Sequence, residues 1–191
     1  MSHYVMPLSP IEREIVAVLE PVLAAQQCEL VRICVSVSSN KQVDIFVDNI
    51  DTDHHGNRSS IRVDKLQTLH LLVQDVLSAA LQHTLLPGSY ALQLSSPGLD
   101  RPLTRLRHFH KAVGKRICVR LAHSMQSKLQ TGVLLNVQQS GIVLKDLDDS
   151  AARSLLLQWH EMQEVICLYD FAYRRDQKSL ATKLSTAGRG K

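Results

Sequence analysis

The stretch Tyr90–Leu103 constrains the fold of this chain more than any other part of it. Apolar residues alternate with small or polar ones at its start, which is the two-residue period of a strand with one buried face. A type II turn then ends the strand, because Pro97 presets φ at the second turn position and Gly98 supplies the positive φ at the third. We expect this rigid turn to hold two bodies in a set relation, and we call it the corner. The corner comprises Ser95, Ser96, Pro97, Gly98, Leu99, Asp100, Arg101 and Pro102.

The residues before the corner predict a small α/β layer. Ser9 and Glu12 form a capping box around a helix start, and Pro21 is expected to bend or break that helix. A second helix should begin near Val63 or Asp64. The remaining segments are two antiparallel strands and the strand that leads into the corner, so that two helices pack on three strands. The first two strands are predicted at Leu30–Ser36 and Val43–Val47, joined by a turn at Ser38–Lys41.

The residues after the corner predict a second, all-strand body. His108–Gly114 has the pattern of a short helical turn, and five short strands follow within about fifty residues, with Gly132 as an expected bend. So few short strands cannot form a sandwich, and closure into a small barrel would remove their exposed edges. The strands are predicted near Ile117–Leu121, Gly132–Val137, Ile142–Leu144, Ser154–Trp159 and Val165–Leu168.

These patterns predict an α+β chain with two domains and a tail. The expected α/β N-terminal domain spans residues 1–98 and the β-barrel domain spans 99–173. Residues 174–191 have few apolar side chains and are expected to be a disordered basic tail. No segment has the length and apolar character of a membrane span or a signal peptide, so the sequence predicts a cytoplasmic protein, expected to be a monomer.

Charge is distributed unevenly along the chain. Residues 1–100 have a net charge of −5, residues 101–120 of +7, residues 121–173 of −3 and residues 174–191 of +5. We call residues 101–120 the basic block, because they hold 7 Lys or Arg and no Asp or Glu. Clustered cations on an otherwise acidic chain are typical of local contact with phosphates.

No residue pattern predicts catalysis, a cofactor or a metal. Asp51–Gly56 resembles the start of a calcium loop, but Arg62 occupies the position of the closing glutamate. No pair of histidines among His54, His55, His108, His110 and His160 has helical ligand spacing with a third ligand nearby. The four cysteines lack Cys-x-x-Cys spacing and are expected to be reduced core residues: Cys28, Cys34, Cys118 and Cys167.

The sequence also does not favour sequence-specific reading of RNA bases, because the chain has only 8 Phe, Tyr and Trp residues and a core would take most of them. Trp159 is assigned to the core rather than to base stacking. Contact with an RNA backbone or with a partner protein is instead assigned to the cations of the basic block. These are Arg101, Arg105, Arg107, Lys111, Lys115, Arg116 and Arg120.

The run Ser-Ser-Pro-Gly-Leu-Asp-Arg-Pro-Leu at residues 95–103 closely resembles the signature of the bacterial ribosome maturation factor family RimP. The resemblance covers roughly Ile11–Leu168; it departs from the usual pattern at Cys28, where glycine is common, in the loop 51–60 and in the tail. It implies a Sm-like or SH3-like barrel and a factor that binds the free 30S small ribosomal subunit late in assembly. The implied partners are 16S rRNA and small-subunit ribosomal protein twelve, without catalysis. Further matching runs are Cys28-Glu29-Leu30-Val31, Val47-Asp48 and Phe109–Gly114.

Two other functions stay open at this point. The first is a Sm-like RNA-binding regulator of messenger or small RNAs, which the acidic first domain disfavours because it would repel RNA. The second is a hydrolase that uses Ser95 or Ser96 with a distant histidine, which rests on residue types alone.

Overall fold

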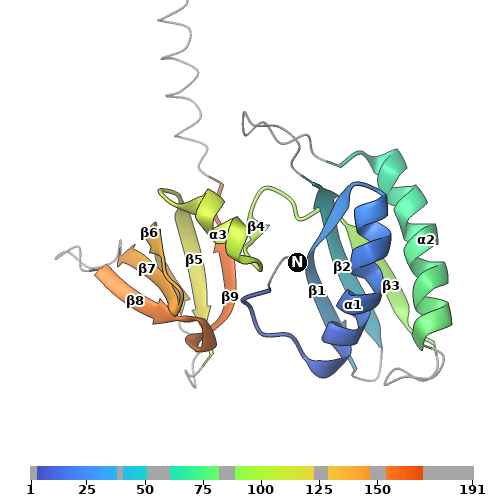
Figure 1. Ribbon diagram of the computed structural model, residues 1–191, viewed down its shortest axis with the longest axis horizontal. Coiled ribbons are helices and arrows are strands. Elements are labelled where there is room, and N and C mark those ends of the chain that lie inside the picture. The colour runs from blue at the N-terminus through green and yellow to red at the C-terminus, as the bar shows by residue number, and fades with distance from the viewer. Residues whose placement is uncertain are drawn as a thin grey trace, which may run out of the picture.

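The protein folds into two sheets that lie side by side, with three α-helices (Figure 1). The computed structural model describes residues 4–37, 41–50, 61–81, 89–122, 129–146 and 154–169. Three strands form one sheet in the order β1-β2-β3, and six strands form a second sheet in the order β4-β9-β5-β6-β7-β8. The predicted α+β class is therefore confirmed.

The first layer has the predicted order of helix, strand, strand, helix, strand. Strands β1 and β2 are antiparallel, whereas β3 runs parallel to β2 and reaches it through the α2 crossover. Both helices cover one face of the sheet (Figure 1). The elements are α1 (Pro10–Ala25), β1 (Cys28–Ser36), β2 (Gln42–Asn49), α2 (Val63–Leu81) and β3 (Ala91–Ser95).

Helix α1 begins at the predicted capping box. The side chain of Ser9 accepts a hydrogen bond from the backbone N–H of Glu12, and the Glu12 carboxylate accepts one from the N–H of Ser9 at 2.8 Å. Of the predicted bend or break at Pro21, the break is wrong, because the helix continues through it to Ala25. Pro21 and Ala17, four residues earlier, both lie on the exposed face, where the carbonyl that loses its helical partner can turn toward water.

The first core lies between these helices and the sheet. It contains the apolar residues that the helical and strand periods select, and the corner strand adds Tyr90, Leu92 and Leu94 at its margin. Full burial of such side chains stabilises a fold by about 1.5–3 kcal/mol each. The most deeply buried members are Ile15, Leu19, Leu23, Leu30, Val43, Ile45, Val47, Leu69, Val73 and Leu77.

The second sheet contains the five predicted strands and one more, β4, made by the end of the corner. Its strands pair antiparallel throughout. A second core fills its inner face, where Phe109 meets Trp159 edge to face at 5.0 Å between ring centroids. The elements are β4 (Arg101–Pro102), α3 (Leu106–Ala112), β5 (Arg116–Leu121), β6 (Leu129–Val137), β7 (Gly141–Asp146), β8 (Ser154–Gln158), the 3₁₀ turn η1 (Trp159–Glu161) and β9 (Met162–Cys167).

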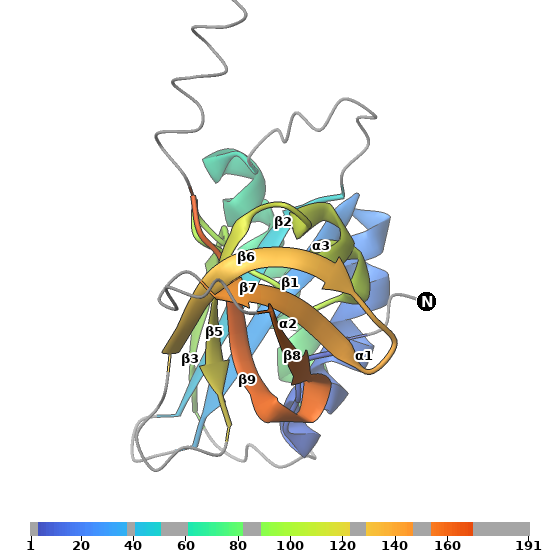
Figure 2. The same ribbon diagram turned by 90° about the vertical axis from the view of Figure 1, so that its left-hand side faces the viewer.

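The strand order leaves β4 and β8 at the two ends of this sheet, and among the described residues no ladder joins them. Figure 2 shows β6 and β7 bending strongly across the rest of the sheet. Gly132 lies inside β6, where an added Cβ would stand 2.4 Å from the carbonyl oxygen of Lys145. The irregular pairing of β6 occurs later, between Leu134 and Asn136. A closed barrel therefore stays a prediction.

A short segment ahead of α1 contacts both layers. Tyr4 packs against the first core and pairs as an isolated bridge with Arg105, while Met6 belongs to the second core. The backbone N–H of Val5 donates to the carbonyl of Thr104 at 2.9 Å. The amino-terminal residues therefore contribute to the second body as well as to the first.

Several predicted features lie outside the described residues: the hairpin tip 38–40, the loop 51–60 with His54 and His55, and the basic tail 174–191. The division into domains at 98 and 173 stays a prediction. In the part of the chain that the structure describes, none of the helices combines the length and the apolar character that a membrane crossing requires.

Candidate functional site

The corner contains the positive φ that its sequence predicts, whereas its type II turn stays a prediction. Gly98 has a φ of +73°, which L-residues with a side chain rarely adopt. The tip is exposed, and 61% of Leu99 is accessible to solvent. Asp100 ties this tip to the end of the second sheet, because its Oδ1 accepts a hydrogen bond from the backbone N–H of Tyr169 at 2.9 Å.

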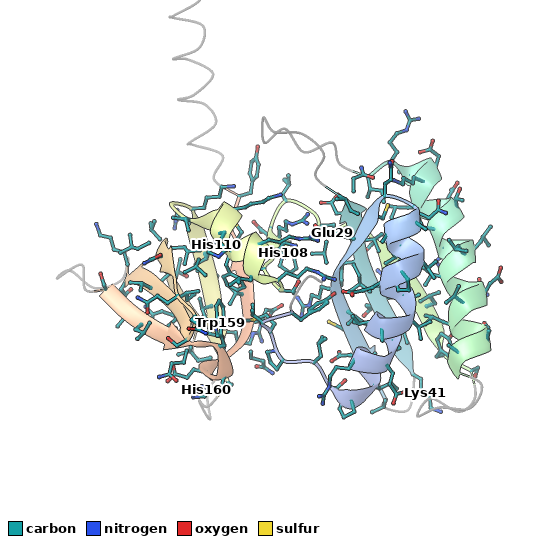
Figure 3. The ribbon with its side chains drawn as sticks, in the orientation of Figure 1. Glu29, Lys41, His108, His110, Trp159 and His160 are labelled. Atoms are coloured by element: carbon teal, nitrogen blue, oxygen red, sulfur yellow. The ribbon has the colours of Figure 1, made fainter. Side chains whose placement is uncertain are left out.

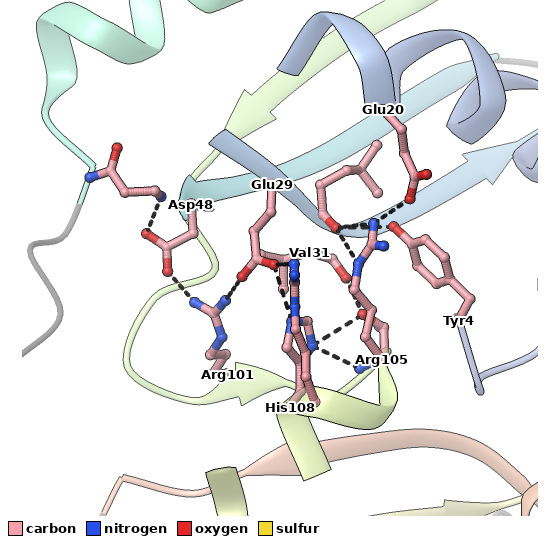
Figure 4. Close-up of polar contacts among 12 residues, drawn as sticks. Tyr4, Glu20, Glu29, Val31, Asp48, Arg101, Arg105 and His108 are labelled. Atoms are coloured by element: carbon pink, nitrogen blue, oxygen red, sulfur yellow. Dashed lines mark hydrogen bonds and ion pairs between the residues drawn. The ribbon is translucent and has the colours of Figure 1, made fainter. Parts of the chain in front are cut away.

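Unlike the tip of the corner, Arg101 lies in the interior. Only 6% of the residue is exposed, and its guanidinium lies between two carboxylates of the first layer (Figure 4). One terminal nitrogen donates to Glu29 Oε1 at 2.7 Å, and the other pairs with Asp48 Oδ2. The Nε atom is buried and has no hydrogen-bond partner among the described residues. A buried charge is tolerated only when it is paired, so this cation holds the two layers together.

Glu29 is the centre of the contact between the layers. Besides Arg101, its carboxylate pairs with Arg107 through Oε2 and lies 3.4 Å from Nε2 of His108. Glu29 and His108 are both buried and face each other between the two sheets (Figure 3). One carboxylate on β1 therefore binds three nitrogen-bearing side chains from the corner and from α3.

Arg105 makes a second buried connection. Its terminal nitrogen donates to Glu20 Oε1 at 2.7 Å and to the carbonyl of Leu30 at 3.0 Å, and its guanidinium lies 4.1 Å from the ring centroid of Tyr4. The Tyr4 hydroxyl donates to the same Leu30 carbonyl at 3.0 Å. Burial raises the pKa of Tyr4 above its usual value, although Arg105 opposes the rise. The phenol therefore stays protonated and keeps its donor.

Two further contacts widen this interface. The hydroxyl of Thr104 donates to the carbonyl of Val31. On β9, Glu164 pairs with Arg32 of β1 and with Arg120 of β5, the latter at 3.2 Å. The interface thus contains two carboxylates, Glu29 and Glu164, that each bind more than one arginine.

The sequence comparison agrees with this region. Residues 18–100 match the family model described as the RimP N-terminal domain. Over this segment the chain is similar to the RimP family, and the match supports that family for it. The matched segment contains Glu20, Glu29 and Asp48, and it ends one residue before Arg101.

The structure divides the predicted contact residues into three groups. Arg101 and Arg105 are buried and engaged with carboxylates, so their guanidiniums are shielded from an external phosphate. The side chains of Arg107 and Arg120 are 43% and 44% exposed and pair with Glu29 and Glu164. The third group is fully at the surface around the end of α3 and the start of β5: Lys111, Lys115 and Arg116.

Most of the basic block therefore meets protein acids. Contact with phosphates stays a prediction for the exposed members of the block and is corrected for Arg101 and Arg105, because burial next to carboxylates satisfies both. Sequence reasoning did not assign their partners Glu20, Glu29 and Asp48. One signal was present, since Glu29 and Asp48 each interrupt an apolar strand run and the first hundred residues are acidic.

A small pocket lies between the amino-terminal segment, β1 and β9. It encloses about 150 Å³ and is lined in part by Tyr4, Cys34, Thr104 and Gln163. Small-molecule sites usually measure roughly 300–1,000 Å³. Burial raises the pKa of the Cys34 thiol, which keeps it protonated and poorly nucleophilic. The geometry of this pocket does not favour catalysis at Cys34.

Proposed function

We propose that this protein is a ribosome maturation factor that binds the free 30S small ribosomal subunit and assists its late assembly. The match of residues 18–100 to the RimP N-terminal domain supports this function. We propose further that the protein acts by binding and performs no catalysis, and that it works in the cytoplasm. Its partners would be 16S rRNA and small-subunit ribosomal protein twelve.

The proposal depends on the division of the basic block into buried and exposed cations. Buried arginines join the acidic first layer to the second sheet, while Lys111, Lys115 and Arg116 remain at the surface on an ordered helix end and strand start. Gly114, with a φ of +81°, makes the turn between that helix and that strand. Cations held on ordered structure lose little entropy when they meet phosphates, so these three are the proposed rRNA contacts.

The first layer, in contrast to the three exposed cations, is acidic. Residues 1–100 have a net charge of −5, and part of that charge remains after Glu20, Glu29 and Asp48 are paired internally. An acidic surface attracts a basic ribosomal protein and repels RNA. We therefore propose that residues 1–98 form a domain that recognises protein twelve, that residues 99–173 form a Sm-like barrel domain, and that the tail 174–191 is disordered and adds attraction to rRNA.

Sedimentation of cell extract through a sucrose gradient tests this function. The factor is expected to migrate with free small subunits and to be absent from assembled ribosomes. Migration at the top of the gradient with short RNAs would instead indicate a Sm-like regulator of messenger or small RNAs, and would contradict the proposal.

A further inference from the structure

Four side chains form a row across the strands β5 to β8 on one face of the second sheet. Arg116 on β5 lies opposite Val133 on β6, and Val133 lies opposite Lys145 on β7. The row continues to Ser154 on β8, which lies opposite Lys145. Residues directly opposite each other on neighbouring strands point to the same face of a sheet. We call Arg116, Val133, Lys145 and Ser154 the outer row.

The outer row lies on the face that is turned away from the second core. Its neighbours along the strands, Ile117, Leu134 and Leu144, are fully buried in that core. Because successive side chains alternate between the two faces of a strand, the row points to the other side. Both of its cations are exposed. Figure 2 shows β6 and β7 in front, with the three-stranded sheet behind them.

The positive charge of the outer row is not neutralised on its own face. Among the residues that the structure describes, Arg116 and Lys145 form no ion pair. Asp146, the next residue along β7, is turned to the opposite face by the alternation of the strand. Glu164 lies on the outer side of β9, but two arginines already bind it. The row therefore attracts an external anion.

The side chains of this face match a phosphate backbone better than they match bases. Guanidinium, ammonium and hydroxyl groups are the usual side-chain donors to the phosphate oxygens of nucleic acids. The outer row supplies all three, and Thr131 adds a second hydroxyl two residues before Val133 on the same face of β6. The described residues of β5, β6 and β7 include no Phe, Tyr or Trp. Unstacked bases are held on such rings, whereas double-stranded RNA is bound through its shape, its 2′-hydroxyls and its phosphates.

An acidic peptide is a poorer occupant of this face. The strands β5, β6 and β7 each have a neighbour on both sides, so their backbone groups are used by the sheet and cannot pair with a further strand. The N–H groups of a peptide would also need acceptors, and most of the outer row consists of cations and valine. Phosphate oxygens need only donors, which the row supplies.

We propose that the outer row binds the sugar–phosphate backbone of a double-stranded RNA segment, with Arg116 and Lys145 on separate phosphates and Ser154 donating a further hydrogen bond. The two cations stand two strands apart, about 9–10 Å between their backbones. Contacts at two separated phosphates fix the orientation of the duplex on the sheet as well as adding affinity. This inference rests on the proposed function, since rRNA supplies the duplex, and it extends the RNA contact to Lys145, which lies outside the basic block.

The test measures the binding of the full chain to a fluorescent RNA duplex of about 16 base pairs, by anisotropy at several salt concentrations. Lys145→Gln and Arg116→Gln should each weaken binding about two- to fivefold. Each should also lower the slope of log affinity against log salt by about 1, because one phosphate contact is lost. Arg13→Gln removes an exposed cation of α1 and is the matched control, with the slope unchanged. Duplexes of different base sequence should bind equally.

Measurements on the unaltered chain do not depend on how any variant folds. The amide NMR signals of the outer row should shift when the duplex is added. Two other probes serve as controls: the single strand of the same length and a glutamate peptide of the same total charge as the duplex. Both are expected to bind at least about threefold more weakly than the duplex.

Three results would overturn the inference. The first is a salt slope for Lys145→Gln equal to that of Arg13→Gln. The second is binding of the single strand or of the glutamate peptide as tight as that of the duplex, which would assign the face to another class of ligand. The third is a set of NMR shifts that leaves out the outer row.

Failure of the proposed function gives a different result. A chain that binds the duplex through the outer row but does not migrate with free small subunits would contradict a role in ribosome assembly and leave this inference standing. A chain that migrates with the subunits while Lys145→Gln behaves like the control would do the reverse.

Discussion

Replacing Arg101 with methionine removes the cation that joins Glu29 and Asp48 while keeping a long apolar side chain. Removing one partner of a buried ion pair costs about 3–5 kcal/mol, because the other charge is left buried without compensation. Arg101 is 6% exposed and both of its acids are also buried, so that range applies here.

Glu29 and Asp48 differ in the hydrogen-bond and ion-pair partners that remain after Arg101 is replaced. Glu29 retains Arg107 and His108, whereas the remaining described donor to Asp48 is the backbone N–H of Asn49 at 2.9 Å. Asp48 is therefore the carboxylate left mainly without a compensating charge. We expect the free energy of unfolding to fall by about 3 kcal/mol, near the lower limit of that range. For a chain of this size, that corresponds to a fall of roughly 6–12 °C in Tm.

Urea unfolding followed by circular dichroism measures this cost, and Arg116→Met is the matched control. Arg116 is exposed on β5, so the same substitution there should change the free energy of unfolding by no more than about 0.5 kcal/mol. Adding Asp48→Asn to Arg101→Met should recover part of the loss, because the stranded charge is removed. A loss for Arg101→Met no larger than that of Arg116→Met would refute the view that Arg101 holds the layers together.

Three further changes test other parts of the structure. Gly98→Ala should cost about 1 kcal/mol in urea unfolding, because its φ is +73° while an added Cβ would meet nothing within 4 Å; no measurable loss would contradict the requirement for a positive φ. The Tyr4→Phe variant should lose less free energy of unfolding than the wild type as pH rises above about 10. The pKa of Tyr4 is raised in the fold, so the wild type loses stability once the phenol of the unfolded chain ionises. Parallel curves of stability against pH for the two proteins would contradict the burial of Tyr4. Alanine at all three exposed cations should weaken binding to small subunits more than deletion of 174–191 does, and should lower the slope of log affinity against log salt by about 2–3. Arg13→Ala with Arg62→Ala is the control. A larger effect of the tail deletion would show that the tail, and not these cations, is the main contact with rRNA. The three exposed cations are Lys111, Lys115 and Arg116.

Local features of the fold could be predicted from the sequence because their causes lie within a few residues. The capping box at Ser9 and Glu12 and the positive φ of Gly98 each depend on neighbouring residues and have the predicted form. The strand periods likewise located β5 to β9 to within a few residues. The exception is Pro21, whose effect depends on whether its face of the helix meets solvent.

Whether each arginine is buried or exposed could not be predicted in the same way. Arg101 and Arg116 belong to one basic block, yet one is buried and the other exposed. The difference comes from acids that are distant along the chain, since Asp48 lies 53 residues and Glu29 lies 72 residues from Arg101. Net charge by segment predicted an attraction without distinguishing an internal partner from an external one.

The amino-terminal segment imposes an order on folding during synthesis. Tyr4 packs on Arg105, and Met6 packs in a core with Val165, so both must wait for residues made much later. At about 5–20 residues per second, the interval before Val165 is made is roughly ten to thirty seconds. Helix α1 can form early and Tyr4 can meet Leu30, but Met6 lacks Val165 until β9 has left the ribosome. A nascent chain stalled before β9 would therefore keep Met6 exposed to chaperones and proteases.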